Sequence, residues 1–559
     1  MKIKTFIHNI LKFGLITTLK QRKLTKKRQK LSLKDIQSFH MVDDAVLSSQ
    51  RNIKFKEGIL FSIITPLYNT PKEYLEELIE SVKKQTYENW ELCFADGSDF
   101  SHNYVEDICK KCILEDKRIK YIKLTENKGI SENTNECIKI AKGNYYVLLD
   151  HDDLLHPSAL FEAAKVIEEK NADFIYTDEA KFSKKPELID NIYNFNFKSG
   201  FGIDELRSHN YICHLTIFNK SLIQNEKVIY RKEFDGSQDH DMVLRLTEKA
   251  KCIVHIPKVL YYWRVHENSV SKNINVKSYC IDSAIKAVTE QLIRNNENGI
   301  VYSSFPFQTL YKIDYKYDPK VNITIILHHC ENRNILEKNI KELRKIGDFE
   351  IIYLYSEPIS SLGGINFISN NINFSDQINQ AVKQSSNEFI LLLECGCVPK
   401  NLDCIYQLLM HVQRKNIGSV SGKVINKDNT VYYAGIALDF SKNDCIYRFG
   451  ELSTTMDYGY EAMLSYVRNT TIQSDTCLIF KKELFNKING FNDIKGYECI
   501  DFSLRLFSEG YRNVWTPYAL FSKINKNNDY SYDSSEFYGF WNGMKEEYLN
   551  DSIKKIHLV

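Results

Sequence analysis

Residues 59–73 have the sequence ILFSIITPLYNTPKE, which predicts a strand, a loop and the start of a helix. The first six residues form a continuous apolar run, which is typical of a strand buried on both faces of a sheet. Thr70 and Glu73 flank Pro71 with the spacing of a capping box that has proline in the first turn. Apolar residues then follow at the spacing of one helix face as far as Val82. The unit is therefore strand, loop and helix.

The same alternation continues to residue 149. Strands are expected at residues 92–95, 121–124 and 145–149, and helices at residues 105–114 and 131–141. Strands that alternate with helices imply βαβ crossovers and a mostly parallel sheet. The fold class is therefore α/β and Rossmann-like, and ligands should bind beyond the carboxyl ends of the strands.

The chain also carries an internal repeat. Residues 127–150 align without a gap with residues 371–394, and residues 244–246 align with residues 504–506. A repeat of this length indicates two tandem copies of one domain. The predicted organisation is a basic N-terminal tail at 1–57, a first domain at 58–270, a helical linker at 271–319, a degenerate second domain at 320–530 and a C-terminal tail at 531–559.

The composition excludes several classes of protein. The 559 residues are 43% hydrophobic and 26% charged, which is too apolar for a disordered chain and too polar for a multi-span membrane protein. Most of the 14 cysteines lie in apolar runs, as expected for reduced core residues in the cytoplasm.

The charge is unevenly distributed along the chain. Residues 1–34 hold 11 basic and no acidic side chains, so the net charge of +2 for the whole chain leaves −9 for the rest. An anionic body argues against nucleic-acid binding. The apolar stretch at 6–19 is too short and too polar for a spanning helix or a secretory signal. The tail is either an interfacial anchor on an anionic membrane surface or a disordered, solubilising arm.

Carboxylates follow the predicted strand at 145–149. Asp150, Asp152 and Asp153 surround His151 in the loop that this strand delivers to the binding edge of the sheet. Oxygen ligands of this kind suit a hard divalent cation such as Mg²⁺ or Mn²⁺. The alternative is an acidic turn that caps the following helix.

Several motifs resemble, in order and spacing, the family 2 inverting glycosyltransferases of the GT-A fold. The first four are SIITPLYN at 62–69, ADGSD at 95–99, NKGIS at 127–131 and LLDHDDLLHP at 148–157. Three more extend the match, namely NYICHL at 210–215, GSQDHDMVLR at 236–245 and HIPKVLYYWR at 255–264. The second copy also resembles such a domain, as in bacterial surface-polysaccharide enzymes, and the expected architecture is two tandem GT-A-like domains.

The resemblance implies a role for each donor-site residue. Asp96 would hydrogen-bond the nucleobase, and Asp150 would face the ribose. Thr65 and Pro66 would border the nucleotide. The implied donor is a nucleoside diphosphate sugar.

The resemblance also implies the reacting groups. Asp152 would bind the Mn²⁺ or Mg²⁺ that neutralises charge on the leaving diphosphate. His266 is a candidate for a third metal ligand or a phosphate contact, and a plain surface histidine is the alternative. Asp239 matches the general base, which takes the proton of the acceptor hydroxyl. Asp241 is expected to be structural and to pair with Arg245 one turn on.

The second copy lacks these groups. Gly396 stands in the place of Asp152, and Cys499 in the place of Asp239, so this copy is expected to be catalytically silent. His328, His329 and Cys330 replace the residues after the first strand, and a metal site of the histidine and cysteine type is one interpretation of them.

Together these features predict a metal-dependent, inverting hexosyltransferase. It would move a sugar from a nucleoside diphosphate to a hydroxyl of a growing, lipid-linked glycan, in the cytoplasm or peripherally on the inner face of a bacterial plasma membrane. The alternatives are a non-catalytic carbohydrate-binding or scaffold protein and a bifunctional polysaccharide polymerase. Asp96, Asp152 and Asp239 argue against the first, and Gly396 and Cys499 against the second.

Overall fold

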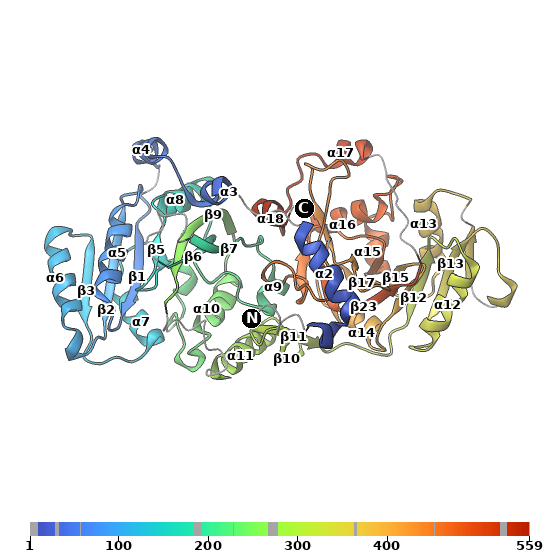
Figure 1. The fold of residues 1–559 in the computed structure, drawn as a ribbon, viewed down its shortest axis with the longest axis horizontal. Coiled ribbons are helices and arrows are strands. Elements are labelled where there is room, and N and C mark those ends of the chain that lie inside the picture. Colours follow the sequence, from blue (N-terminus) through green and yellow to red (C-terminus); the bar gives the residue numbers. More distant parts are fainter. Residues whose placement is uncertain are drawn as a thin grey trace.

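The computed structural model places two α/β halves at opposite ends of an elongated molecule (Figure 1). A helix and a β-hairpin lie between them, near the middle of the view. The structure describes residues 9–27, 33–55, 58–183, 192–226, 228–266, 278–362, 366–369, 371–451, 453–525 and 534–557.

The first half is built on a mixed sheet. Its strands are β1 (Phe61–Leu67), β2 (Trp90–Asp96), β3 (Ile119–Lys123), β4 (Tyr145–Leu148), β5 (Leu154–Leu155), β6 (Phe174–Phe182), β7 (Ile192–Asn196), β8 (Thr216–Asn219) and β9 (Ile253–Arg264). Within the described residues they run in the order β3-β2-β1-β4-β8-β6-β9-β5, with β7 on β6. The sheet is parallel around β1, as predicted, whereas β5, β7 and β8 are antiparallel to their neighbours.

Helices cover both faces of this sheet. They are α5 (Lys72–Lys83), α6 (Tyr104–Glu115), α7 (Ile130–Ile140), α8 (Ala159–Lys170), α9 (Ile203–Ser208) and α10 (Gln238–Thr247). Successive residues of β1 belong to the cores on opposite faces, Ile63 to one and Ile64 to the other. A continuous apolar run is required for this reason, because both faces of the strand are buried. The predicted alternation of strand and helix is therefore confirmed, with boundaries moved by a few residues.

The predicted capping box at α5 does not form. The Thr70 hydroxyl lies 2.7 Å from Nδ1 of His151 instead of bonding to the helix, which begins after Pro71. The loop after β1 is thereby tied to the loop after β4 at the edge of the sheet.

The second half repeats the first strand by strand. Its strands are β12 (Ile323–His328), β13 (Glu350–Tyr355), β14 (Asn366–Ser369), β15 (Phe389–Glu394), β16 (Cys397–Pro399), β17 (Ile417–Asn426), β18 (Val431–Tyr433), β21 (Arg468–Thr470), β22 (Cys477–Lys481) and β23 (Arg512–Lys523). The order β14-β13-β12-β15-β22-β17-β23-β16 matches that of the first sheet position by position. A small ribbon of β19 (Ile436–Leu438) and β20 (Ile446–Arg448) is added. The predicted duplication is visible in this common topology, and the exact domain boundaries stay a prediction.

Helices also flank the second sheet. They are α12 (Arg333–Arg344), α13 (Phe374–Gln384), α14 (Cys404–Val412), α15 (Lys482–Lys487), α16 (Glu498–Ser508), α17 (Ser535–Trp541) and α18 (Asp551–His557). The last two lie in the expected C-terminal tail and are packed onto the body, with Phe537 and Ile553 buried. The Asn550 amide donates to Asp178 of the first half at 2.9 Å. The end of the chain therefore helps to join the halves.

The expected helical linker contains a helix and a hairpin. After α11 (Ser278–Arg294) the chain forms β10 (Gly299–Ser304) and β11 (Leu310–Tyr315), which pair antiparallel. Residues 267–277 of the expected linker and of the adjoining first domain lie outside the described residues. The hairpin contacts α9 on one side and α14 on the other, so it is part of the interface between the halves.

The N-terminal segment is helical and packed where the structure describes it. It forms α2 (Leu15–Lys27), α3 (Leu33–His40) and α4 (Asp44–Asn52). Lys20 forms a 2.6 Å ion pair with Asp428 of the second half, over which α2 lies in dark blue in Figure 1. His40 is buried against Tyr262 of the first half. A disordered arm is therefore the wrong description of these residues.

The membrane-anchor hypothesis for the tail stays a prediction. Residues 1–8 and 28–32, which carry several of its cations, lie outside the described residues. Leu11 and Ile16 are largely exposed. None of the described helices combines the length and the apolar composition that a membrane span requires.

A buried ion cluster holds the two halves together. Asp204 of α9 is almost fully buried and forms ion pairs with Arg414 at 2.6 Å and Arg512 at 3.6 Å, both from the second half. Arg207, one turn on, pairs with Glu297 at the start of the hairpin. Burial alone would raise the pKa of Asp204, but the surrounding guanidinium groups lower it below its ordinary value. The carboxylate is therefore a charged contact across the interface.

Substitution of Asp204 should loosen this interface. Asp204→Ala would leave buried guanidinium charge without its partner, which lowers the free energy of unfolding by about 3–5 kcal/mol. Urea unfolding followed by fluorescence measures the change. Asp348→Ala, which removes the exposed partner of Arg344, is the matched control and should leave the midpoint unchanged. Equal midpoints for both variants would show that the cluster does not hold the halves together.

Candidate active site

A cleft of about 1920 Å³ opens at the carboxyl ends of the strands of the first half. Its walls come from the loops after β1 and β4, from the start of α10, and from α11 and the hairpin. Residues of the second half also line it, in the segment from Met456 to Ala462. The cleft is therefore shared by both halves of the chain.

The loop after β4 brings its acidic residues to this cleft, as predicted. Asp150, His151 and Asp152 line it, and Asp152 Oδ2 lies 2.9 Å from Nε2 of His266. His266 follows β9, which is far from β4 in sequence but enters the same edge of the sheet. The structure thus brings together the two residues that were predicted to bind the metal.

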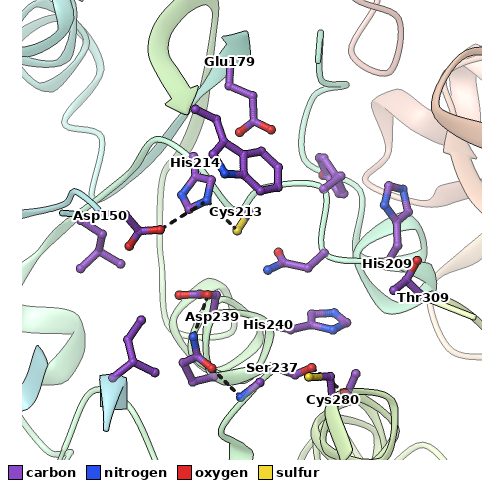
Figure 2. Close-up of a pocket in the computed structure, with 18 of the residues that line it drawn as sticks. Asp150, Glu179, His209, Cys213, His214, Ser237, Asp239, His240, Cys280 and Thr309 are labelled. Atoms are coloured by element: carbon purple, nitrogen blue, oxygen red, sulfur yellow. Dashed lines mark hydrogen bonds and ion pairs between the residues drawn. The ribbon is translucent and has the colours of Figure 1, made fainter. Parts of the chain in front are cut away.

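Figure 2 shows that Asp150 points into the cleft towards His214. Their Oδ2 and Nε2 atoms are 3.8 Å apart. The enclosing walls of the cleft and then the neighbouring Asp152 carboxylate raise the pKa of Asp150 to about 7. A nearby cation would lower this raised pKa, because the cation favours the charged form of the carboxyl group.

Asp239 stands in the first turn of α10 and lines the same cleft (Figure 2). The Tyr230 hydroxyl donates to its Oδ1, and the Gln238 amide donates to its Oδ2 at 3.2 Å. Burial and then the Asp150 charge raise the pKa of Asp239, although the Tyr230 bond opposes the shift. An oriented carboxylate with a raised pKa has the properties of a general base.

The carboxylate and imidazole side chains of the cleft fit a divalent cation. Ligand atoms of Asp150, Asp153 and His214 all lie within 4.8 Å of one another. Asp153 is fully buried, however, and already accepts from the Tyr261 hydroxyl at 2.5 Å and from a backbone N–H. Carboxylates and imidazoles open to the cleft are ligands that Mn²⁺ accepts. Asp150, Asp152, His214 and His266 are therefore the residues that could hold it.

Two predicted donor residues do not line the cleft. Asp96 is fully buried and accepts from the Tyr121 hydroxyl at 2.8 Å and from Lys123 Nζ at 2.9 Å. Thr65 is also fully buried, because the alternation of β1 turns Ile64 and Pro66 to the cleft and Thr65 away from it. Contact of Asp96 with a nucleobase would require its present partners to give way, so the expected roles of Asp96 and Thr65 stay predictions.

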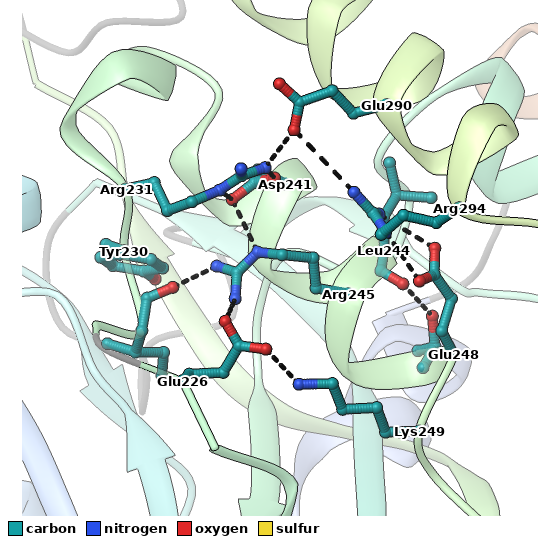
Figure 3. Close-up of polar contacts among 12 residues, drawn as sticks. Glu226, Tyr230, Arg231, Asp241, Leu244, Arg245, Glu248, Lys249, Glu290 and Arg294 are labelled. Carbon is teal, nitrogen blue, oxygen red and sulfur yellow. Dashed lines mark hydrogen bonds and ion pairs between the residues drawn. The ribbon is translucent and has the colours of Figure 1, made fainter. Parts of the chain in front are cut away.

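Asp241 has the structural role that the sequence predicted. It is fully buried and accepts from Arg245 Nε at 3.0 Å and from Arg231. Figure 3 shows that Arg231 also reaches Glu290 of α11, while Arg245 reaches Glu226. This network fixes the orientation of α10 and hence the position of Asp239 in the cleft.

Sequence reasoning missed several cleft residues. A signal existed for His214, because it lies inside the motif at 210–215. No local signal pointed to Tyr458 or Glu461, since only the docking of the second half brings them to the cleft.

The position of the second half that matches Asp150 is closed. Glu394, the counterpart of Asp150, is buried and forms a 2.5 Å ion pair with Lys523. The Tyr432 hydroxyl donates to the same carboxylate at 2.9 Å. Gly396 offers no side chain in the place of Asp152. Internal partners therefore take the oxygens that would face a ligand.

Comparisons with known proteins show what this chain is similar to. Residues 62–226 match Glycosyl transferase family 2. The uncharacterized protein y4gI of Sinorhizobium fredii is 30% identical over 490 residues, which cover 83% of this chain and 53% of that protein. The O-antigen biosynthesis protein RfbC of Myxococcus xanthus is 24% identical, over 82% of this chain and 36% of that protein. The chain thus spans about half, or less, of the length of these relatives.

Among solved structures, that of S. aureus TarS 1–349 in complex with UDP-GlcNAc is 18% identical, covers 42% of this chain and 67% of that chain, and has a TM-score of 0.35. The family match covers β1 to β8, including the loop that carries Asp150 and Asp152. The part of the chain that forms this side of the cleft, residues 62–226, is therefore a glycosyl transferase family 2 domain.

Proposed function

We propose that the chain is a metal-dependent, inverting glycosyltransferase that extends a bacterial surface glycan. The observation that carries the proposal is the set of carboxylates in one cleft, with Asp152 beside His266 on one wall and Asp239 at the start of α10. These are the groups that transfer needs, one to hold the leaving diphosphate through a cation and one to accept a proton.

The donor would be a nucleoside diphosphate sugar bound at the ends of β1 and β4. Asp152 and His266 would hold Mn²⁺ or Mg²⁺, which supplies positive charge to the leaving diphosphate. Asp150, whose pKa lies near 7 without the cation, would be held in its charged form beside it. Pro66 would border the nucleotide, since it lines the cleft beside these groups.

Asp239 would take the proton of the acceptor hydroxyl as that oxygen attacks the sugar carbon. The carbon–oxygen bond to the diphosphate breaks as the new glycosidic bond forms, and attack from the opposite side inverts the configuration. The hydrogen bonds from Tyr230 and Gln238 orient the carboxylate, and burial with the raised pKa makes it a stronger base. Both of these donors are neutral, so the carboxylate is oriented without being paired to a cationic side chain by either of them.

The acceptor glycan would lie towards the second half. The cleft is larger than a site of roughly 300–1,000 Å³ that suits one small ligand. Tyr458 of the second half and Phe307 of the hairpin present aromatic rings 6.0 Å apart on this side. A relative named for O-antigen biosynthesis supports a polysaccharide acceptor. The second half would thus bind acceptor without performing transfer.

The two other candidate functions have less support. A bifunctional polymerase would need a second open site, yet Glu394 is paired with Lys523. A carbohydrate-binding protein without turnover would not need Asp152 and Asp239 in the same cleft. Transfer by the first half alone accounts for both observations.

Asp239→Asn should reduce turnover by about 10²–10⁴-fold and leave donor affinity nearly unchanged, because an amide cannot accept the proton. Steady-state transfer, measured alongside binding of the nucleotide, separates the two effects. Loss of donor affinity in place of turnover would remove Asp239 from the role of base.

Asp152→Asn should reduce metal-dependent donor hydrolysis by about 10²–10³-fold, because an amide oxygen is a poor ligand for a hard cation. Hydrolysis of a panel of nucleoside diphosphate sugars with and without Mn²⁺ measures this. Asp107→Asn, on the exposed surface of α6, is the control and should keep the wild-type rate. A wild-type rate for Asp152→Asn in saturating Mn²⁺ would contradict the metal assignment.

Tyr458→Ala should raise the KM for the acceptor about 2–10-fold and leave donor hydrolysis unchanged, because stacking by one aromatic ring contributes about 0.5–1.5 kcal/mol. Tyr538→Ala is the matched control, since Tyr538 lies on α17 outside the cleft. An unchanged KM in both variants would place the acceptor elsewhere.

A further inference from the structure

Two adjacent histidines end β12 in the second half, opposite an aspartate that precedes β22. Ligand atoms of His328, His329 and Asp475 all lie within 4.8 Å of one another. They occupy the edge of the second sheet that corresponds to the cleft edge of the first sheet. None of these three residues takes part in the proposed transfer reaction.

The hydrogen bonding of His328 leaves one ring nitrogen available. Its Nε2 lies 2.9 Å from the backbone carbonyl of Asp475, and a carbonyl oxygen can only accept, so Nε2 carries the hydrogen. The side chain is completely buried, which disfavours a charged ring. Nδ1 then bears a lone pair, and it has no hydrogen-bond partner among the described residues. Histidine ligands of metals characteristically donate their other N–H in this way.

The unpartnered nitrogen faces a carboxylate. His328 Nδ1 lies 3.9 Å from Asp475 Oδ2, and His329 Nε2 is hydrogen-bonded to the same oxygen at 3.2 Å. The lone pair of His328 Nδ1 and the carboxylate oxygen gain nothing from each other without a cation between them, and such a cation would take the place of the proton that His329 and Asp475 share. Ligands about 2.0–2.1 Å from a tetrahedral Zn²⁺ are about 3.3–3.4 Å apart, so small adjustments would complete the site.

Neighbouring groups hold these ligands in place. The His329 ring stacks on Phe374, with ring centres 4.8 Å apart and planes inclined by 13°. The Ser474 hydroxyl lies 3.1 Å from the second carboxylate oxygen of Asp475. The His329 and Asp475 side chains are 23% and 30% exposed, which gives an ion a path from solvent. The site therefore has a fixed buried side and one open side.

The composition of the cluster indicates the type of metal. Two imidazoles and one carboxylate suit Zn²⁺, with water at the fourth position, better than they suit Mg²⁺. Cys330, which the sequence grouped with the histidines, is buried elsewhere with its Sγ 3.5 Å from the carbonyl of Leu327. The third ligand is therefore Asp475, whereas the sequence alone would suggest Cys330.

We propose that His328, His329 and Asp475 form a Zn²⁺ site in the second half. The ion ties the end of β12 to the segment before β22, at the sheet edge where the first half holds its carboxylates. This site is separate from the cleft and does not depend on the proposed transfer reaction.

Zinc content of the full chain tests the proposal. Purified protein is stripped with a chelator, loaded with Zn²⁺, dialysed and measured by elemental analysis. Wild type and the control His102→Ala should each retain one more equivalent of zinc than His329→Ala or Asp475→Asn. In the Asp152→Asn background, which removes a ligand of the cleft, His329→Ala should again lower the zinc content by one equivalent. His102 is a suitable control because it lies at the surface of the first half. Asp152→Asn separates this ion from one bound in the cleft.

Two further readouts make the result decisive. Zn²⁺ should raise the melting temperature of the wild type but not that of His329→Ala, and circular dichroism verifies that each variant is folded. Co²⁺ in place of Zn²⁺ should give visible absorption that is lost in the conservative variant Asp475→Asn. Equal zinc content in wild type, His329→Ala and Asp475→Asn would overturn the proposal, whether or not Asp152→Asn affects transfer.

Discussion

The ion cluster around Asp204 is the interaction on which the cleft depends. A buried carboxylate of α9 faces the buried Arg414 and the partly exposed Arg512 of the other half. Asp204 and Arg414 depend on each other, because either charge would be costly to bury alone. The cluster fixes the second half against the hairpin and the first half. Because the segment around Tyr458 reaches the cleft only through this docking, the interface determines the shape of the acceptor side.

The two halves show how one topology supports different chemistry. Strand order is the same in both sheets, so equivalent residues meet at equivalent edges. In the first half Asp150 and Asp152 are open to the cleft, whereas Glu394 of the second half is neutralised by Lys523. The fold provides the edge, and a few side chains at the strand ends decide whether it binds a ligand.

Local patterns in the sequence were enough to predict much of this structure. The apolar run before Thr65 could only be a strand buried on both faces, and the constant alignment offset predicted the repeat. Asp152 and His266, which the family resemblance named as candidate metal ligands, lie 2.9 Å apart, although their contact itself was not predicted. The partners of Asp96 and the wall formed by Glu461 were not predictable, because they depend on packing between segments that are distant in sequence.

A crystal structure of the full chain with Mn²⁺ and either uridine diphosphate or thymidine diphosphate tests the central claim most directly. The account predicts that the diphosphate lies beside Asp152 in the cleft, with the ion joining the phosphates to that carboxylate and Asp239 facing the site of the sugar. Nucleotide bound at the Glu394 edge of the second half, or an ion bound in the cleft without Asp152, would contradict it.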